Sequence, residues 1–387
     1  MKSLVRAGAA LVGAAAALVL GPAGIASAAP IFADPGGPSL PVAHAVFVQT
    51  DSPAGNQIIV LAEHSDGRLS ERQVVSTGGL GAQAPGAVVD PLASQGSVVY
   101  DAVHRLLFAV NAGSGTLSVF SAQGRDLQLV QVVNSGGEFP DSIAVQGNLV
   151  YVLNAGGSGS VQGYGIFGRH LFALPNASAS LGLSNTDPPN FLMGPGEIGF
   201  SPAGNELLVT TKASTSSIDT FAVGPAGQLS AAPTVTVDPG SVPFSFVFSP
   251  AGQLVVAEAA VSAVHTFALD TSGALTSLGA VGDSQKALCW ITAVGGYYYV
   301  ANAGSADLSA YSVAANGTPS LVGTTGVVAA TDAGPIDLAA SQDGTKLYAE
   351  TGGAGSIDEF QVNADGSLTS LGSVAGLGAG IEGIATD

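Results

Sequence analysis

The sequence is poor in positive charge and in cysteine. Its 387 residues include 10 Lys and Arg against 28 Asp and Glu, which gives a formal net charge of −18. Nucleic acids and anionic membrane surfaces are bound through clusters of Lys and Arg, so we expect neither as a partner. The single cysteine, Cys289, excludes an internal disulfide and a cysteine-based metal cluster.

The sequence also lacks any segment with sustained helical periodicity. It contains instead 54 Gly and 21 Pro, with 47% hydrophobic and only 10% charged residues. Short strands joined by tight turns need glycine at the turn positions. The composition therefore indicates a large all-β protein.

Common catalytic and metal-binding signatures are absent as well. No Gly-x-Ser-x-Gly motif occurs, and the glycine-rich run at residues 156–159 precedes no helix that could bind a phosphate. The histidines fall at turns, strand starts or an outer strand, without metal-ligand spacing. They are His44, His64, His104, His170 and His265. We therefore expect no metal site.

The first 28 residues predict a signal peptide. Lys2 and Arg6 precede an apolar run over residues 7–20, and residues 26–28 are small enough for cleavage. That run is shorter than the roughly 20 apolar residues that span a bilayer. We expect a secreted, extracytoplasmic protein with no membrane insertion after cleavage, with an uncleaved anchor as the alternative. Residues 29–40, rich in Pro and Gly, are expected to form a flexible leader.

What the sequence does contain is a repeat. Six times a short segment ends in an aromatic residue before a polar turn, and a degenerate copy ends at Leu61. These aromatic anchors are Phe120, Tyr164, Phe221, Phe267, Tyr311 and Phe360. Successive anchors lie 44 to 59 residues apart. Such a period, carried by strands rather than helices, is typical of β-propeller blades.

Each repeat divides into four short strands, so residues 41–387 predict a single all-β domain, a seven-bladed β-propeller with four-stranded blades. After blade 1, the inner strands would begin near residues 96, 141, 197, 244, 288 and 336.

Residues 45–48 match a second strand, which leaves blade 1 without an inner strand. Residues 381–385 match an inner strand with no blade behind it. We therefore expect the C-terminal strand to close blade 1, and a monomer, because a closed ring has no open edge.

Two details concern blades 3 and 4. Residues 170–196, rich in Asn, Ser and Pro, are expected to form an extended connection between these blades. The second strand of blade 4 would run to Lys212, and its fourth strand would lie around Leu229.

In a propeller, the starts of the inner strands and the ends of the second strands reach one face of the central funnel. From these positions we take as candidate ligand-binding residues Asn111, Asn154, Trp290, Asn302, Asp337 and Glu350. The alternative for the asparagines is that each caps a strand end by bonding to backbone. The alternative for the carboxylates is a solvated structural role, and for the tryptophan it is packing between blades.

Lys212 is the one basic residue that the repeat places at the funnel. The others of the mature chain fall in turns, on an outer strand or in a connection. We expect Lys212 to face an acidic partner, Glu197 of its own blade or Glu258 of the next. A structural ion pair and a ligand contact are both open.

Several segments resemble the lactonase-type seven-bladed propellers, which are often labelled 6-phosphogluconolactonase-like or 3-carboxymuconate cyclase-like. They are Asp90-Pro91-Leu92-Ala93-Ser94-Gln95-Gly96, Leu107-Phe108-Ala109-Val110-Asn111-Ala112-Gly113-Ser114 and Leu149-Val150-Tyr151-Val152-Leu153-Asn154-Ala155-Gly156. Residues 209–213, 243–246, 257–259 and 287–290 resemble an exported branch of that family. The resemblance covers nearly the whole mature chain.

This resemblance implies a propeller that opens or closes a lactone without metal or organic cofactor, through His, Arg and Glu in the funnel. The family's Pro-His pair is replaced here by Pro140-Asp141, Pro243-Phe244 and Pro335-Ile336, and no funnel arginine is found. A phosphorylated lactone needs cationic groups to hold its phosphate. We therefore do not expect literal 6-phosphogluconolactonase activity.

Two functions follow. The first is a cofactor-free lactone hydrolase or cyclase for a neutral or weakly charged small molecule. Lys212 would stabilise the oxyanion, and Glu258 or Glu197 would act as general base. The second is a non-catalytic exported propeller that binds a small-molecule ligand or an extracellular protein through the funnel face.

Overall fold

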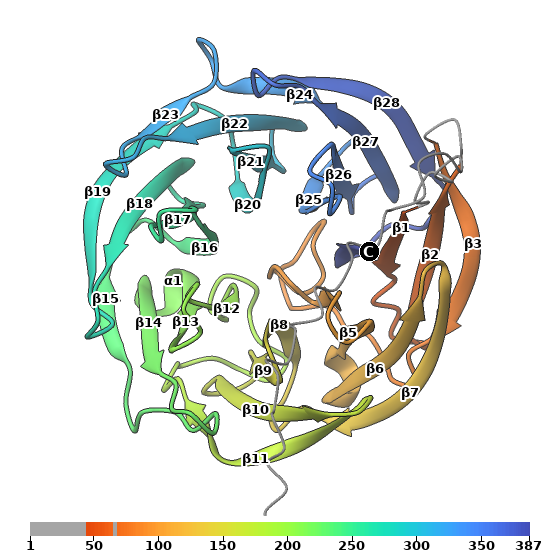
Figure 1. Ribbon diagram of the computed structural model, residues 1–387, viewed down its shortest axis with the longest axis vertical. Helices are drawn as coiled ribbons and strands as arrows, with labels where there is room; N and C mark the ends of the chain where they lie inside the picture. The colour runs from red at the N-terminus through yellow and green to blue at the C-terminus, as the bar shows by residue number, and fades with distance from the viewer. Residues whose placement is uncertain (1–43, 65–67) are drawn as a thin grey trace, which may run out of the picture. The chain divides into compact units, whose positions relative to one another are not determined.

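The computed structural model describes residues 44–64 and 68–387, so the predicted signal peptide and leader lie outside the described residues. Seven antiparallel sheets form a ring around a central axis (Figure 1). The prediction of a seven-bladed β-propeller is confirmed. Within the described residues, no helix is long and apolar enough to span a bilayer.

The ring closes through strands from opposite ends of the chain. Blade 1 consists of β29 (Ile384–Thr386), β1 (Ala45–Gln49), β2 (Gln57–Glu63) and β3 (Leu69–Ser76). In the pairing of β29 with β1, Phe47 lies opposite Ala385 and Val48 opposite Ile384. The predicted closure by the C-terminal strand is confirmed, and it leaves the inner edge of β1 paired.

The other blades follow in chain order from the inner strand outward. Blade 2 consists of β4 (Val98–Asp101), β5 (Leu106–Asn111), β6 (Thr116–Gln123) and β7 (Asp126–Asn134), with the 3₁₀ turn η1 (Ala112–Ser114). Blade 3 consists of β8 (Pro140–Gln146), β9 (Leu149–Asn154), β10 (Ser160–Phe167) and β11 (His170–Ser180). Blade 4 consists of β12 (Ile198–Phe200), β13 (Glu206–Thr210), β14 (Ser217–Ala222) and β15 (Thr234–Val237), with the one-turn helix α1 (Lys212–Thr215).

Blades 5 to 7 complete the ring. Blade 5 consists of β16 (Pro243–Phe248), β17 (Leu254–Glu258), β18 (Ala263–Leu269) and β19 (Leu275–Gly282). Blade 6 consists of β20 (Leu288–Val294), β21 (Tyr297–Asn302), β22 (Asp307–Val313) and an outer strand in two pieces, β23 (Pro319–Leu321) and β24 (Val327–Ala330). Blade 7 consists of β25 (Pro335–Ala340), β26 (Lys346–Thr351), β27 (Ser356–Val362) and β28 (Leu368–Ala375).

The repeated aromatic anchors all lie on third strands, and all are buried. In blades 1, 2, 5 and 7 the pairing with the outer strand shifts register at the anchor, as at Phe120 and Phe360. A bulge at this place bends the outer strand and increases its twist. The repeat that is visible in the sequence therefore marks one structural position, a buried residue on the third strand of each blade.

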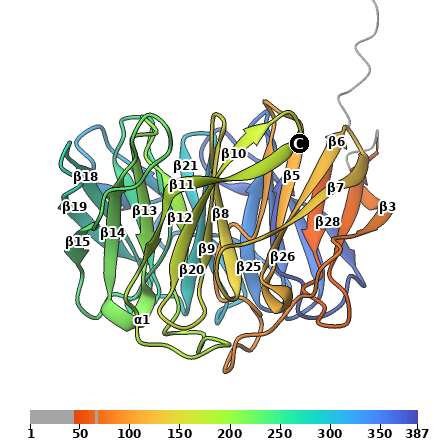
Figure 2. The ribbon, with the colours of Figure 1, turned by 90° about the horizontal axis from the view of Figure 1, so that it is seen from below.

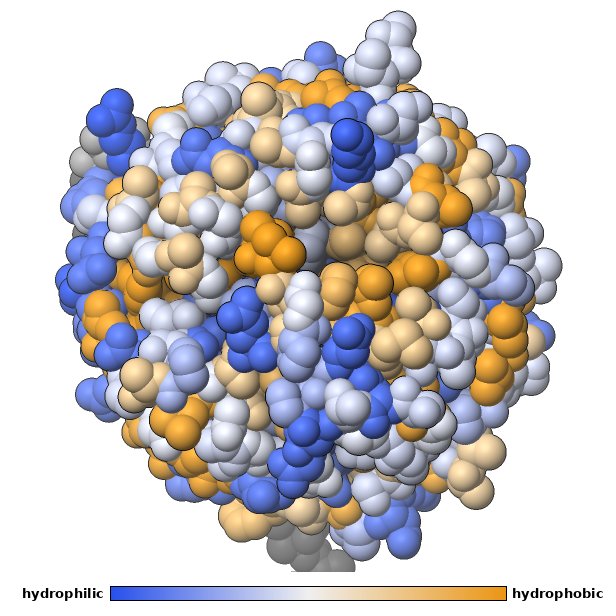
Figure 3. Space-filling view, turned by 180° about the vertical axis from the view of Figure 1, so that it is seen from behind, coloured by the Kyte–Doolittle hydropathy of each residue, from blue (hydrophilic) through white to orange (hydrophobic). Residues whose placement is uncertain are grey.

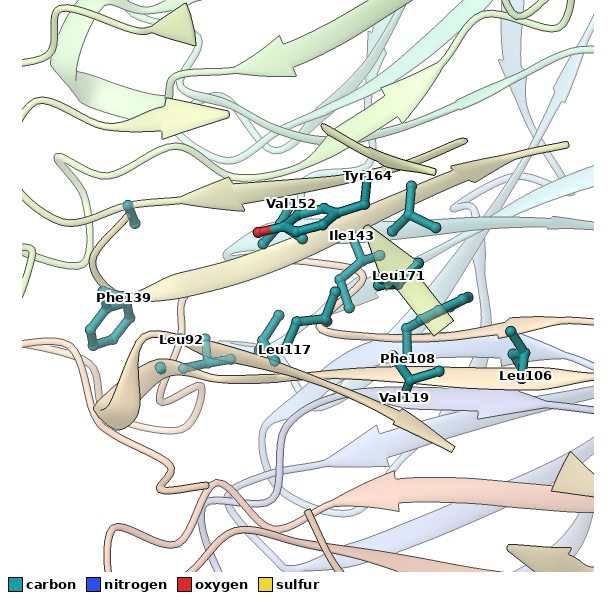
Figure 4. Packing of buried hydrophobic residues seen from close by; sticks show 14 of the residues in the cluster. Leu92, Leu106, Phe108, Leu117, Val119, Phe139, Ile143, Val152, Tyr164 and Leu171 are labelled. Carbon is teal, nitrogen blue, oxygen red and sulfur yellow. The ribbon is translucent and has the colours of Figure 1, made fainter. Parts of the chain in front are cut away.

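Neighbouring blades are held together by apolar side chains between their faces. Between blades 2 and 3, Phe108 and Val119 meet Ile143 and Val152, and Tyr164 closes the cluster (Figure 4). Each strand sends alternate residues to its two faces, and in the second strands each face packs against the blade on that side. The second strands are consequently buried along almost their whole length, and β5 and β13 are buried throughout.

Three boundaries differ from the expectation. The second strand of blade 4, β13, ends at Thr210 instead of reaching Lys212, which begins α1. The segment 170–196 is not one connection, because residues 170–180 form β11, and only residues 181–196 connect the blades. The fourth strand of blade 4 is β15, whereas Leu229 makes only a single bridge with Val223. The two outer strands, β11 and β15, carry hydrophobic residues that are exposed, such as Phe172, Val235 and Val237. Burial therefore does not mark these strands in the sequence.

Three segments lie along one rim of the ring, the lower edge in Figure 2: α1, residues 77–97 between β3 and β4, and residues 181–197 between β11 and β12. The same rim carries the ends of the second strands, as the sequence predicted for the funnel mouth. Figure 3 looks onto this face.

Candidate functional site

The connection between β3 and β4 enters the centre of the ring, where it appears in orange in Figure 1. Ser94 Oγ donates to the carbonyl of Asp141 at 2.8 Å. The Gln95 side chain bonds both backbone groups of Ile291, at 2.8 and 3.0 Å, and Trp290 Nε1 donates to Ser94 O at 2.9 Å. We call residues 90–96 the central segment. It spans the funnel from blade 3 to blade 6, a placement that the sequence did not predict.

Four inner strands present one side chain each from an equivalent bulge. The pairing with the second strand skips Asp141, Phe244, Cys289 and Asp337. An unpaired bulge residue is re-aimed relative to its neighbours. In blade 6 this position is Cys289, so Trp290 stands one residue beyond the position that the sequence analysis gave it. The indole still reaches the centre, through its bond to Ser94.

Lys212 is buried at the hub, with only 1% of its surface exposed. It begins α1 with a positive φ of 46°, and Nζ donates to the carbonyl of Ala93 in the central segment. Nζ also lies 5.3 Å from the centre of the Phe244 ring. Burial lowers the pKa of Lys212 to about 8, against the opposing attraction of Asp141 and Asp90. Its acidic neighbours are therefore these two residues, rather than the expected Glu197 or Glu258.

The carboxyl groups at the hub are buried, not solvated. Burial raises the pKa of Asp51 to about 8, and those of Asp90 and Asp337 to about 7. It also raises the pKa well above the ordinary value in Asp141, Glu197, Glu350 and Glu382. Both carboxyl oxygens of Asp141 and of Glu382 are buried without a hydrogen-bond partner among the described residues. Burying several negative charges beside a single Lys would be unfavourable, so these carboxyl groups are expected to take up protons and become neutral.

Two of the candidate ligand residues hold the closing strand instead of facing an opening. Glu350 Oε2 accepts from Gly383 N at 2.8 Å, and Asp337 Oδ2 accepts from Ile384 N at 3.4 Å. Both residues are buried. Their carboxyl groups tie blade 7 to the strand that completes blade 1.

The two other acids predicted for catalysis lie apart from Lys212. Glu197 Oε2 accepts from Phe246 N at 2.6 Å and so links blade 4 to blade 5. Glu258 Oε1 lies 2.5 Å from His265 Nδ1. Burial raises the pKa of Glu258 to about 7, and the bond to His265 opposes that rise. The predicted grouping of Lys212 with either acid is not present in the structure.

The three candidate asparagines are completely buried and hydrogen-bonded. Asn111 Oδ1 also accepts from Asn56 Nδ2 of blade 1 at 3.1 Å. Asn111 Nδ2 donates to Ser118 Oγ at 2.8 Å, and Asn302 Nδ2 donates to Ser309 Oγ at 3.0 Å. Asn154 Nδ2 donates to Ser135 O at 3.2 Å. These contacts join second strands to third strands or to the preceding connection. Only Asn154 bonds to a backbone carbonyl, whereas Asn111 and Asn302 bond to side-chain hydroxyls, which differs from the backbone capping given as the alternative.

A pocket of about 370 Å³ opens at the funnel mouth beside the central segment. Its walls are aliphatic and aromatic, with Asp90 as its one acid and Cys289 as its one thiol. The lining residues are Ala87, Val88, Val89, Asp90, Ala93, Phe191, Leu192, Val242, Phe244, Ala259, Ala260, Ala287, Cys289, Trp290 and Ala303. Figure 3 shows hydrophobic side chains gathered around a central hollow on this face. Burial raises the pKa of Cys289 to about 12, which keeps the thiol protonated.

Sequence reasoning missed the central segment, the acid Asp90 that lines the pocket, and the buried acid Asp51. Asp90 Oδ1 accepts from Leu92 N at 3.0 Å and from Ala93 N at 2.6 Å, which folds the segment, while Oδ2 has no partner among the described residues. Asp51, at the end of β1, is buried beside Glu382. One feature could have pointed to them: residues 77–97 form a connection too long for a hairpin, and long connections are often functional.

No protein-family model matches the chain, and no curated protein matches its sequence. Solved structures do match. A Bacteroides fragilis protein described as a presumed 6-phosphogluconolactonase is 18% identical, with a TM-score of 0.69 over 92% of this chain and 100% of that chain. The Pseudomonas aeruginosa periplasmic gluconolactonase PpgL is 18% identical, with a TM-score of 0.66 over 89% of this chain and 99% of that chain. The fold is that of the lactonase-type propellers.

The lactonase-type fold also occurs without a known activity. A functionally unknown protein from Desulfotomaculum acetoxidans is 16% identical, with a TM-score of 0.61 over 88% of this chain and 98% of that chain. A shared fold does not define a reaction, so function has to be argued from the residues of the funnel.

Proposed function

We propose that this chain is an exported propeller that binds a neutral, apolar small molecule at the mouth of its funnel and does not turn it over. The observation that carries this proposal is the pocket beside the central segment, with its almost wholly apolar lining. Its volume of about 370 Å³ falls in the range of small-molecule sites.

The pocket's chemistry favours a ligand without charge. The lining contains no basic residue, so it offers no partner for a phosphate or a carboxylate. The one polar hydrogen of Trp290 is already bonded to Ser94 O, which leaves the ring as an apolar surface. Phe244 stands edge-on to Trp290, with ring centres 5.1 Å apart. Two such rings suit a flat or aliphatic molecule.

The position of Lys212 argues for binding rather than catalysis. A group that stabilises an oxyanion must point to the place where the charge develops. Nζ of Lys212 donates one hydrogen to the carbonyl of Ala93, and the residue is 1% exposed. Lys212 does not line the pocket, so a ligand bound there does not contact this ammonium group.

Trp290 provides a direct test, because it is the only tryptophan. Fluorescence titration with apolar lactones and with cyclic ketones of the same size should give saturable binding of both classes, without hydrolysis. Ala303→Phe, inside the pocket, should abolish this binding. Ala314→Phe, in an exposed turn of blade 6, is the matched control and should not. Binding that survives Ala303→Phe would place the ligand elsewhere, and turnover of a lactone would contradict a non-catalytic role.

One observation supports lactone opening as a second candidate. Asp90 lines the pocket, its Oδ2 is unpartnered among the described residues, and its pKa is raised to about 7. A carboxylate with such a pKa can act as general base near neutral pH. If a lactone is hydrolysed, Asp90→Asn should abolish turnover while the fluorescence titration still reports binding.

A further inference from the structure

A second cluster of polar side chains lies outside the funnel, where blade 4 meets blade 5. It combines Asp238, just after β15, with Glu258 at the end of β17 and His265 in β18. Among the described residues, this is the one place where three atoms able to bind a metal lie within 4.8 Å of one another. His265 Nδ1 is 2.5 Å from Glu258 Oε1 and 3.3 Å from Asp238 Oδ2.

The strand register explains how these residues meet. Glu258 pairs with Ala263, and His265 pairs with Val256, so the two side chains stand on the same face one step apart across the hairpin. Diagonal neighbours of this kind are within reach of long side chains. Asp238 is positioned by its backbone, because its N–H donates to Ser216 O at 2.7 Å. The side chains of His265, Asp238 and Glu258 are 13%, 22% and 4% exposed.

His265 Nδ1, Glu258 Oε1 and Asp238 Oδ2 face one another with too few hydrogen atoms for each to form a hydrogen bond. The other ring nitrogen of His265, Nε2, lies 2.6 Å from Ser277 Oγ. With a hydrogen on Nε2 donated to Ser277, the neutral imidazole turns the lone pair of Nδ1 toward two carboxylates. If the hydrogen is on Nδ1 instead, the imidazole can donate a hydrogen bond to Glu258. Asp238 Oδ2 is then still buried without a hydrogen-bond partner among the described residues. A divalent cation would satisfy all three atoms at once.

We propose that Asp238, Glu258 and His265 bind a divalent transition-metal ion, for which Zn²⁺ is the best match. One imidazole nitrogen and two carboxylate oxygens are ligands that Zn²⁺ accepts, at bonds of about 2.0–2.2 Å. Zn²⁺ is usually coordinated by four ligands in a tetrahedron, in which two neighbouring ligand atoms are about 3.3–3.6 Å apart. Asp238 and His265 already have this separation, and Glu258 has to withdraw by about 1 Å. Ser277 would orient the ring from behind, and water would complete the coordination.

This site is separate from the funnel pocket, whose lining includes none of the three ligands. Sequence spacing did not reveal it, because Asp238 comes from the preceding blade. The metal therefore goes beyond the proposed ligand-binding function, and neither proposal needs the other.

Calorimetric titration of the chelator-treated, full-length mature protein with Zn²⁺ tests the proposal. One ion per chain should bind, and Co²⁺ should give the visible absorption of a four- or five-coordinate site. His265→Gln should weaken Zn²⁺ binding by at least about 100-fold, and Ser277→Ala by about 10-fold. Asp238→Asn, on a partly exposed connection, serves as a second ligand variant in case His265→Gln does not fold.

The chain supplies a matched control. His104 Nδ1 lies 2.5 Å from Asp101 Oδ2, the same contact as in the proposed site, without a second carboxylate grouped with it in the described part of the chain. His104→Gln should leave Zn²⁺ binding unchanged. Absence of saturable Zn²⁺ binding, or equal binding by the wild type, His265→Gln and Asp238→Asn, would overturn the proposal and leave a hydrogen-bonded triad.

Discussion

Two sides of the same funnel are built from equivalent backbone positions but have opposite chemistry. The bulge residues of blades 3 and 7 are Asp141 and Asp337, whereas those of blades 5 and 6 are Phe244 and Cys289. On the first side, acids are buried around Lys212 and the closing strand. On the second side, rings and small side chains leave a pocket.

The contrast teaches that the repeat fixes where a side chain points and not what it does. The central segment crosses the funnel and bonds to both sides, to Asp141 of blade 3 and to Trp290 and Ile291 of blade 6. The apolar side is left partly empty, because short residues such as Ala259 and Ala303 line it. A void with few polar partners does not hold water well, so it favours an apolar ligand.

The substitution Phe244→Asp tests this difference most directly, because it puts a carboxyl group on the apolar side of the funnel. Loss of a buried ring and burial of an acid should together destabilise the fold by about 5 kcal/mol. Ligand binding monitored through Trp290 should also be lost. Urea unfolding measures the first effect, and Phe167→Asp, at a ring that is 80% exposed, is the control. A stable Phe244→Asp variant that still binds the ligand would contradict the assignment of the pocket.

On the acidic side, the corresponding change is Lys212→Ala. It removes the one cation from a group of buried acids and frees the carbonyl of Ala93. Removing one partner from such a buried set should destabilise the protein by about 3–5 kcal/mol. Lys286→Ala, at an exposed residue, should have little effect on the midpoint of urea unfolding. Equal midpoints for the two variants would show that Lys212 does not hold the central segment.

The pH dependence of stability reports on the same acids. The folded pKa of Asp90 and Asp337 is raised from 3.8 to about 7, and that of Asp51 to about 8. The folded state therefore binds more protons than the unfolded state between these limits. This contribution to stability is complete below about pH 4 and is lost as the pH rises through 7 to 8. Urea unfolding should show higher stability at pH 5 than at pH 8, by a few kcal/mol, and the opposite order would contradict the prediction.

Glu382→Gln should have the smallest effect at pH 5. Neither carboxyl oxygen of Glu382 has a hydrogen-bond partner among the described residues, so little bonding is lost. We expect a change below about 1 kcal/mol at pH 5. At pH 8 the variant should be more stable than the wild type, because Gln has no proton to take up on folding. Glu71→Gln, on the exposed outer strand β3, should show no such difference between the two pH values.

Much of the fold was predictable because the anchors repeat. Phe120 and its equivalents mark the third strands, and the unmatched strands at the two ends predict the closure that β29 and β1 make. The candidate site was less predictable. Lys212 does lie at the hub, but its partners Asp90 and Ala93 come from a connection whose path no pattern indicates. The meeting of His265 with Asp238 likewise depends on how two blades pack.

The number of blades, the order of their strands and the closure of the ring could all be predicted from the sequence alone. These features follow from the alternation of hydrophobic and polar residues and from turn residues, which repeat along the chain. Each blade can therefore be recognised from its own segment of sequence. Only the folded structure shows that residues 90–96 occupy the funnel, that Lys212 is buried among acids whose pKa is raised, and that Phe244 and Trp290 line a pocket. These features arise from contacts between segments far apart in the chain, whose energies depend on burial and distance.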